Sequence, residues 1–136
     1  MKQEELDIIL ENHGKWLRNE GGEKADLSNA DLKNTNLRFA NLRLADLRFA
    51  DLSNADLKNT NLSIADLSYA NLRLADLRFA DLSNADLSYA NLSWVNWQHV
   101  EGLTVICVQV DTTRKNNQIT YIKELDIWIT GCFQGT

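Results

Sequence analysis

Residues 25–99 decide the fold of this 136-residue chain, and in groups of five they read ADLSN ADLKN TNLRF ANLRL ADLRF ADLSN ADLKN TNLSI ADLSY ANLRL ADLRF ADLSN ADLSY ANLSW VNWQH. Fourteen consecutive units follow one A-(D/N)-L-x-x pattern, and the fifteenth has Trp97 in the leucine position. The next five residues, VEGLT at 100–104, are interpreted as breaking the pattern by one residue.

On an α-helix, leucines five residues apart drift around the whole cylinder. On a flat strand, an odd spacing sends successive leucines to opposite faces. A solenoid that turns one corner in each unit would keep every leucine inside.

The units resemble those of the pentapeptide-repeat family, and the resemblance covers residues 25 to about 101. It implies an all-β solenoid, a right-handed quadrilateral β-helix in which four units make one coil. The leucine and the small residue two positions before it would point inward. The Asp or Asn before the leucine and the two residues after it would point outward. At an interstrand spacing of about 4.8 Å per coil, fifteen units predict a short rod of about 18 Å.

The first segment, residues 1–24, is expected to be a capping α-helix followed by a turn into the first coil. Within residues 2–18, apolar residues recur at steps of three and four, which indicates one apolar helical face. These residues are Leu6, Ile9, Leu10, Trp16 and Leu17. Gly21 and Gly22 would end the helix. A membrane-surface helix is the alternative, but the polar face is not basic, which disfavours it.

The last segment, residues 102–136, is expected to be a β-strand tail. Residues 103–110 and 119–130 are rich in β-branched and aromatic residues and are predicted strands, joined by a turn at 111–118. An exposed strand edge would make homodimerisation easy. The residues predicted to form such a contact are Ile106, Val108, Ile122, Ile127 and Trp128. Trp94, Trp97 and Trp128 are expected to pack where the rod meets the tail.

Composition predicts a cytoplasmic protein with no membrane association. The formal net charge is −5, and no apolar run is long enough to span a bilayer. The acidic N-terminus does not resemble a secretory signal. Cys107 and Cys132 are therefore expected to be free thiols.

No catalytic, cofactor or metal site is predicted. The sequence has no nucleophile placed near a base, no metal-ligand spacing and no glycine-rich phosphate loop. The aspartates recur every five residues, which is typical of a surface ladder. We therefore expect a non-enzymatic protein.

The four faces of such a rod would differ in charge, because each samples every twentieth residue. The first face carries four acids against one base, Arg48. It is also lined by aromatic residues, a combination found at protein interfaces. The predicted partner-binding residues are Asp26, Asp46, Asp66, Asp86, Phe49, Tyr69 and Tyr89. The second and fourth faces are balanced, and the third is slightly basic. In the alternative interpretation, the aromatics stabilise neighbouring coils and the Asp or Asn side chains satisfy backbone groups at corners.

Three functional hypotheses follow. Family members that resemble this chain include quinolone-resistance proteins, whose acidic rods imitate duplex DNA and engage type II topoisomerases. Short members borne by phages share a segment like KWLRNEGGEKADLSNADL, which implies an inhibitor of a host-defence nuclease, such as a CRISPR or restriction nuclease. Nine aspartates oppose seven Lys and Arg in the repeats, whereas DNA carries one charge per about 1.7 Å, so the mimicry would be partial. In both cases the partner is a nucleic-acid-binding protein, and direct nucleic-acid binding is not expected. The third hypothesis is a structural or assembly module.

Overall fold

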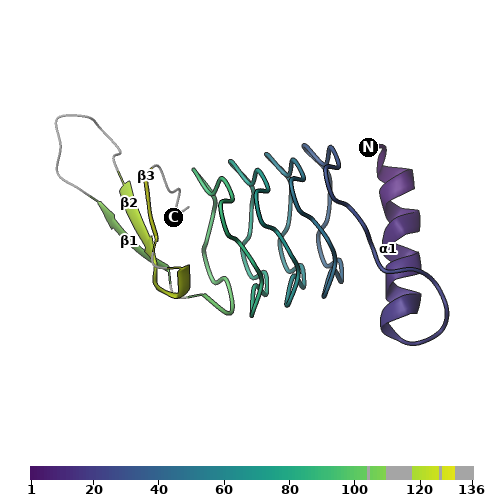
Figure 1. The fold of residues 1–136 in the computed structure, drawn as a ribbon. Helices are drawn as coiled ribbons and strands as arrows, with labels where there is room; N and C mark the ends of the chain where they lie inside the picture. The colour runs from purple at the N-terminus through teal and green to yellow at the C-terminus, as the bar shows by residue number, and fades with distance from the viewer. Residues whose placement is uncertain (104, 110–117, 126, 131–136) are drawn as a thin grey trace.

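The structure is a computed structural model that describes residues 1–103, 105–109, 118–125 and 127–130. Helix α1 spans Gln3–Leu17, and the strands are β1 (Val105–Gln109), β2 (Gln118–Ile122) and β3 (Ile127–Thr130). Figure 1 shows a rod of stacked coils between them, with α1 across its N-terminal end and the strands at the other. The expected helix and tail strands are therefore present. The second predicted strand is not continuous, because the 3-10 helix η1 (Lys123–Leu125) separates β2 from β3.

Four five-residue units complete one coil of the rod. Asp26 forms a parallel bridge with Asp46, and Asp46 forms one with Asp66 twenty residues further on. The Leu47 N–H donates to the Asp66 carbonyl at 2.8 Å, and the Asp66 N–H donates to the Ala45 carbonyl at 3.0 Å. Residues twenty positions apart therefore share a face, as the sequence predicted.

The repeat continues to Glu101, the end of the predicted repeat region. Glu101 bridges to Asp81, and its carbonyl accepts a hydrogen bond from the Leu82 N–H at 2.9 Å. Val100 and Glu101 keep the register, and the predicted one-residue break within VEGLT follows them. Gly102, at φ 84°, then stands where a leucine would be, and a Cβ there would lie 2.4 Å from the backbone nitrogen of Ser83.

The core is a ladder of leucines flanked by small residues. From Leu27 to Leu92 every repeat leucine is at most 3% exposed, and Trp97 continues the ladder at 2%. Thr35 and Thr60 take two of the alanine positions. Their hydroxyls donate to the carbonyls of Leu32 and Leu37, each at 2.7 Å. Both buried hydroxyls are thereby satisfied, which avoids the cost of burying an unpaired polar group.

Each corner requires a residue in the left-handed region. The last residue of every unit has a φ between 56° and 67°. The turn is closed by hydrogen bonds such as that from the Ala50 N–H to the Leu47 carbonyl, 3.1 Å long. Asn tolerates this conformation better than most residues, whereas aromatic and aliphatic residues are strained there. Five units use Asn, and the rest use bulkier residues such as Phe49 and Ile64.

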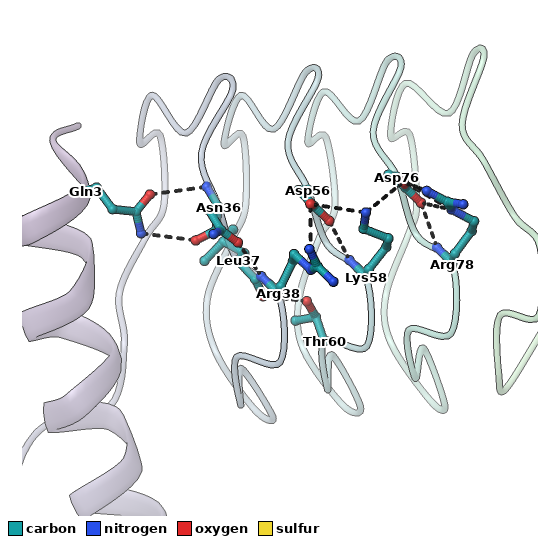
Figure 2. Close-up of polar contacts among 9 residues, drawn as sticks. All are labelled: Gln3, Asn36, Leu37, Arg38, Asp56, Lys58, Thr60, Asp76 and Arg78. Carbon is teal, nitrogen blue, oxygen red and sulfur yellow. Dashed lines mark hydrogen bonds and ion pairs between the residues drawn. The ribbon is translucent and has the colours of Figure 1, made fainter.

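Helix α1 closes the N-terminal end with polar as well as apolar contacts. Leu6 is fully buried, and Ile9 and Leu10 pack against the core. The Gln3 side chain pairs with the backbone of Asn36 through both of its polar atoms (Figure 2). Its Nε2 donates to the Asn36 carbonyl at 3.0 Å, and its Oε1 accepts from the Asn36 N–H at 3.1 Å.

Two further groups of the N-terminal segment bind the same edge. The N-terminal amino group donates to the Asp31 carbonyl at 2.8 Å. His13 contacts the Arg43 carbonyl through Nε2 at 2.9 Å. An uncovered edge of the first coil would present unpaired groups to other chains. The N-terminal segment therefore pairs with backbone groups at the edge of the first coil and also covers its leucines.

The strands at the other end form one antiparallel sheet in the order β1-β2-β3. Ile122 in the central strand is fully buried within the chain. Its predicted role in oligomerisation stays a prediction. The side chains of the other four predicted contact residues (Ile106, Val108, Ile127 and Trp128) and of Cys107 lie outside what the structure describes, as does Cys132. Trp97 is buried as expected, but Trp94 lies at a corner and is 38% exposed.

Candidate functional site

The first face carries a continuous stack of three aromatic rings. Phe49, Tyr69 and Tyr89 end the units 45–49, 65–69 and 85–89, so one coil separates each from the next. Ring centroids are 4.8 Å apart for Phe49 and Tyr69 and 5.0 Å apart for Tyr69 and Tyr89, with interplanar angles of 9° and 14°. The three side chains are 55%, 51% and 81% exposed. We call these three residues the aromatic ridge.

A row of carboxylates runs beside the aromatic ridge on the same face. Asp26, Asp46, Asp66 and Asp86 are linked by successive parallel bridges. The structure therefore brings all seven predicted partner-binding residues into one column. Their role in binding a partner stays a prediction.

One oxygen of each carboxylate stabilises its own corner. Asp66 Oδ1 accepts hydrogen bonds from the Ser68 N–H at 3.0 Å and from the Ser68 hydroxyl at 2.6 Å. Asp26 makes the same pair of contacts with Ser28. The alternative interpretation, in which the Asp side chains satisfy backbone groups at corners, is thus correct for Oδ1. It leaves the second oxygen, Oδ2, free of any role in the corner.

Hydrogen bonds favour the charged form of three carboxylates on this face, those of Asp26, Asp46 and Asp86. Hydrogen bonds from Ser28 lower the pKa of Asp26, and those from Ser88 lower the pKa of Asp86. The hydrogen bond from the Arg48 side chain is the main cause of the lowered pKa of Asp46. These groups therefore stay ionised at neutral pH.

Arg48 is the one base on this face, and it spans two coils. Its Nη2 lies 2.6 Å from Asp46 Oδ2, and its Nε lies 3.9 Å from Asp66 Oδ2. The equivalent positions in the next two coils are Ser68 and Ser88. Arg48 therefore offsets the charge of the two middle acids, Asp46 and Asp66, and no lysine or arginine among the described residues forms an ion pair with Asp26 or with Asp86, the acid nearer the sheet.

The third face, on the opposite side of the coil, has a different arrangement of charges (Figure 2). Lys58 Nζ lies 3.4 Å from Asp56 and 3.9 Å from Asp76, and Arg78 binds Asp76 at 2.7 Å. Arg38 Nε lies 3.9 Å from Asp56. Cations and anions alternate, so each acid on this face has cationic partners.

Aromatic stacking also occurs outside the first face. Phe79 and His99 stack at 4.9 Å on the third face. Arg38 also lies over the Phe39 ring, with its Cζ 5.7 Å from the centroid. The first face is distinguished by an uninterrupted stack beside acids that outnumber its one base.

Among the described residues, no group of three or more His, Cys, Asp or Glu could hold a metal ion. His13 is bound to backbone groups, and His99 stacks on Phe79. The described part of the chain also contains no helix long and apolar enough to cross a membrane.

The sequence matches the family model for pentapeptide repeats in eight copies, over residues 25–63 and 65–96. The chain belongs to the pentapeptide-repeat family. The fold of this family is a right-handed β-helix, which agrees with the coils seen here. Its members are generally non-enzymatic structural or binding proteins, whereas the absence of catalysis in this chain stays a prediction.

Solved structures of pentapeptide-repeat proteins resemble the chain over about half its length. The protein Rfr23 from the cyanobacterium Cyanothece 51142 is 41% identical, with a TM-score of 0.57, and the match covers 58% of this chain and 55% of Rfr23. A protein of the Arabidopsis thaliana thylakoid lumen is 27% identical, with a TM-score of 0.41, covering 56% of this chain and 63% of that one. QnrB1, a plasmid-mediated fluoroquinolone resistance protein, is 26% identical, with a TM-score of 0.24, covering 56% and 47%.

A search of curated proteins gives no match. The cytoplasmic location therefore stays a prediction.

Proposed function

We propose that this pentapeptide-repeat protein is a non-catalytic binding rod whose first face engages a basic surface on a protein that handles nucleic acid. The observation that carries the proposal is the aromatic ridge, with every ring at least half exposed, beside a row of ionised carboxylates. Aromatic anchors next to charged groups dominate the energy of many protein interfaces.

The spacing of the carboxylates favours a partner that normally binds phosphates. Bridged aspartates recur once per coil, so one carboxylate appears about every 4.8 Å along the face. Duplex DNA presents one charge per about 1.7 Å. The face thus offers a row of anions weaker than that of DNA, and Arg48 weakens it further. Its ridge adds apolar contacts that the phosphates of DNA do not supply.

The size of the face indicates a concave partner. One face is at most five residues wide and four coils long, about 16 Å by about 18 Å, or about 290 Å² in plan. A specific interface buries about 800 Å² on each partner. The partner must therefore reach around a corner. The ridge lies at the corner where the first face meets the second, since Ala50, Ala70 and Ala90 begin the following units. A groove built for nucleic acid could enclose this corner.

Two variants with matched chemistry test the proposal. The first, the ridge variant, combines Asp66→Asn, Asp86→Asn, Tyr69→Asn and Tyr89→Asn. The second, the control variant, combines Asp56→Asn, Asp76→Asn, Phe39→Asn and Phe79→Asn on the third face. Asn already occupies both kinds of position elsewhere in the repeats, at Asn71 and Asn54 for example. Each variant changes the net charge by the same amount and removes two exposed rings.

The measurement is affinity capture from bacterial lysate, with elution by a short DNA duplex and identification of the eluted proteins. The proposal predicts that the wild type and the control variant capture the same nucleic-acid-binding protein and that the ridge variant does not. A topoisomerase and a defence nuclease are both in this class, and the identification separates them. If the ridge variant captures the same protein, the ridge only stabilises the coils, and the proposal is wrong. If no variant captures a partner, the assembly-module hypothesis replaces it.

A further inference from the structure

The open end of the aromatic ridge has features that suit one particular side chain of a partner. Tyr89 stacks on Tyr69 through one ring face, and its side chain is 81% exposed. Since the ring is in contact on one side only among the described residues, its other face is open. Asp86 belongs to the same five-residue unit, and no lysine or arginine among the described residues pairs with it. An exposed ring beside a carboxylate that has no lysine or arginine partner in the described part of the chain fits a cation.

Resting on the proposed function, we infer that the end of the ridge formed by Tyr69, Tyr89, Asp66 and Asp86 is a docking surface for an arginine side chain of the protein partner. The guanidinium lies against the open face of Tyr89 and pairs with the Asp86 carboxylate of the same unit.

The first argument for arginine is that the chain contains both halves of this arrangement already. On the third face, Arg38 lies over the Phe39 ring at 5.7 Å and pairs with Asp56 of the next coil at 3.9 Å. A guanidinium at a corner of this rod thus contacts a ring and a carboxylate at the same time. The planar guanidinium stacks on aromatic faces and binds carboxylates in a fork, which the ammonium group of lysine does not do.

The second argument comes from Arg48, which joins the carboxylates of Asp46 and Asp66. Asp66 and Asp86 are bridged in the same way, one coil further along. The residue that corresponds to Arg48 in that coil is Ser68, whose hydroxyl binds Asp66 Oδ1. The two arrangements differ in that no arginine among the described residues joins Asp66 to Asp86, so Asp86 lacks the arginine partner that Asp46 has. A partner arginine would supply Asp86 with the cation that Arg48 supplies to Asp46.

The rest of the first face fits this ligand less well. Phe49 has no hydroxyl and is covered on one side by Tyr69, and the acids beside it share Arg48. The third face has paired acids, so a further cation there would compete with Lys58 and Arg78. The end of the ridge near Tyr89 therefore combines the most exposed ring with excess negative charge.

The test uses two end-capped peptides, hexa-arginine and hexa-lysine, titrated into the full-length protein at low salt. They carry equal charge, so general attraction to the acidic protein is the same for both. The inference predicts that hexa-arginine binds about two- to fivefold more tightly, the range expected for an exposed cation–π contact. Tyr89→Asn should remove this preference while hexa-lysine binding stays unchanged. Phe39→Asn, the control on the opposite face, should keep the preference.

A second variant tests the site without removing any of its residues. Ser68→Arg places an internal arginine where Arg48 stands one coil earlier, and arginine is already used at this position in five units. It should pair with Asp66 and Asp86 and abolish the preference for hexa-arginine. The inference would be overturned if Ser68→Arg or Tyr89→Asn kept the preference for hexa-arginine. It would also be overturned if the wild type bound the two peptides with equal affinity. Loss of partner capture in the ridge variant would then still support the proposed function, so the two can fail separately.

Discussion

His13 Nδ1 accepts a hydrogen bond from the backbone N–H of Ala25, 3.0 Å away, and so joins the capping helix to the first residue of the first coil. In later units the N–H at this position donates to a leucine carbonyl three residues earlier, as Ala50 does to Leu47. Ala25 has no preceding repeat, and the imidazole takes the place of that carbonyl. Because Nδ1 accepts, Nε2 must carry the proton that it donates to the Arg43 carbonyl.

This arrangement requires a neutral histidine, so stability should fall in mild acid. Burial lowers the pKa of His13 below its ordinary value of 6.5. The unfolded chain then binds a proton at pH values where the folded chain does not. The contribution of neutral His13 to the free energy of unfolding is complete above about pH 6.5 and is lost as the pH falls below that value.

The measurement is the free energy of unfolding in urea at pH 7.5 and pH 5.0, for the wild type and His13→Gln. The wild type should lose more stability than the variant over this interval. An equal loss in both proteins would show that His13 does not titrate as its burial requires.

The turn after α1 should tolerate alanine at one glycine and not at its neighbour. Gly21 and Gly22 have φ values of 87° and 76°, so alanine is strained at both. A Cβ at Gly21 meets nothing within 4 Å, whereas one at Gly22 would lie 2.2 Å from the Asn12 carbonyl oxygen. Gly21→Ala should cost about 1–2 kcal/mol from the left-handed conformation alone. Gly22→Ala should cost about 1–3 kcal/mol more from overpacking. Urea unfolding of both variants checks this, and equal losses would rule out the close approach.

The corners explain why this protein should be easy to stabilise. Ile64 and Asn84 occupy the same corner of successive coils, with φ values of 58° and 56°. A β-branched side chain is strained in this region, while Asn is tolerated. Ile64→Asn should stabilise the rod by about 0.5–1 kcal/mol, and Asn84→Ile should destabilise it by about the same amount. Thermal unfolding of the reciprocal pair is the test, and a destabilising Ile64→Asn would mean that packing along the corner outweighs the strain.

The neutral substitutions used to test the first face should leave its corners intact. Asn can replace the corner hydrogen bond of Asp66 to the Ser68 N–H, but Ala cannot. Asp66→Ala should therefore be less stable than Asp66→Asn by about 1 kcal/mol, the usual value of one such bond. Thermal unfolding of the two variants measures the difference. If they are equally stable, the side-chain oxygen does not stabilise the turn.

The leucine period was sufficient to predict a solenoid with a leucine core, and the resemblance to the pentapeptide-repeat family supplied the four units per coil from which the columns of outward residues follow. With four units in each coil, the unbroken register then places Asp26, Asp46, Asp66 and Asp86 on one face. Stacking of the aromatic ridge follows from the same period, because rings one coil apart lie at about the interstrand spacing. The composition of the candidate site was therefore visible in the sequence.

Contacts between non-repeating parts could not be predicted in this way. Gln3 and His13 act on backbone groups more than 20 residues away, and only the position of α1 brings them together. His13 did leave a signal, since it lies seven residues after Leu6 and thus on the apolar face of the helix. The interruption of the second tail strand by η1 depends on how the last coil meets the sheet. The five-residue period carries no information about that junction.

Photo-crosslinking from the ridge is the most direct test of the claim that the first face binds a protein. A photoreactive phenylalanine analogue at Tyr89 keeps a ring in the stack, and the same analogue at Phe39 is the control, since the two side chains are 81% and 70% exposed on opposite faces. The account predicts that irradiation in lysate links a nucleic-acid-binding protein to position 89 and not to position 39. Crosslinking of the same protein from position 39 alone would contradict it, as would no crosslink from either position.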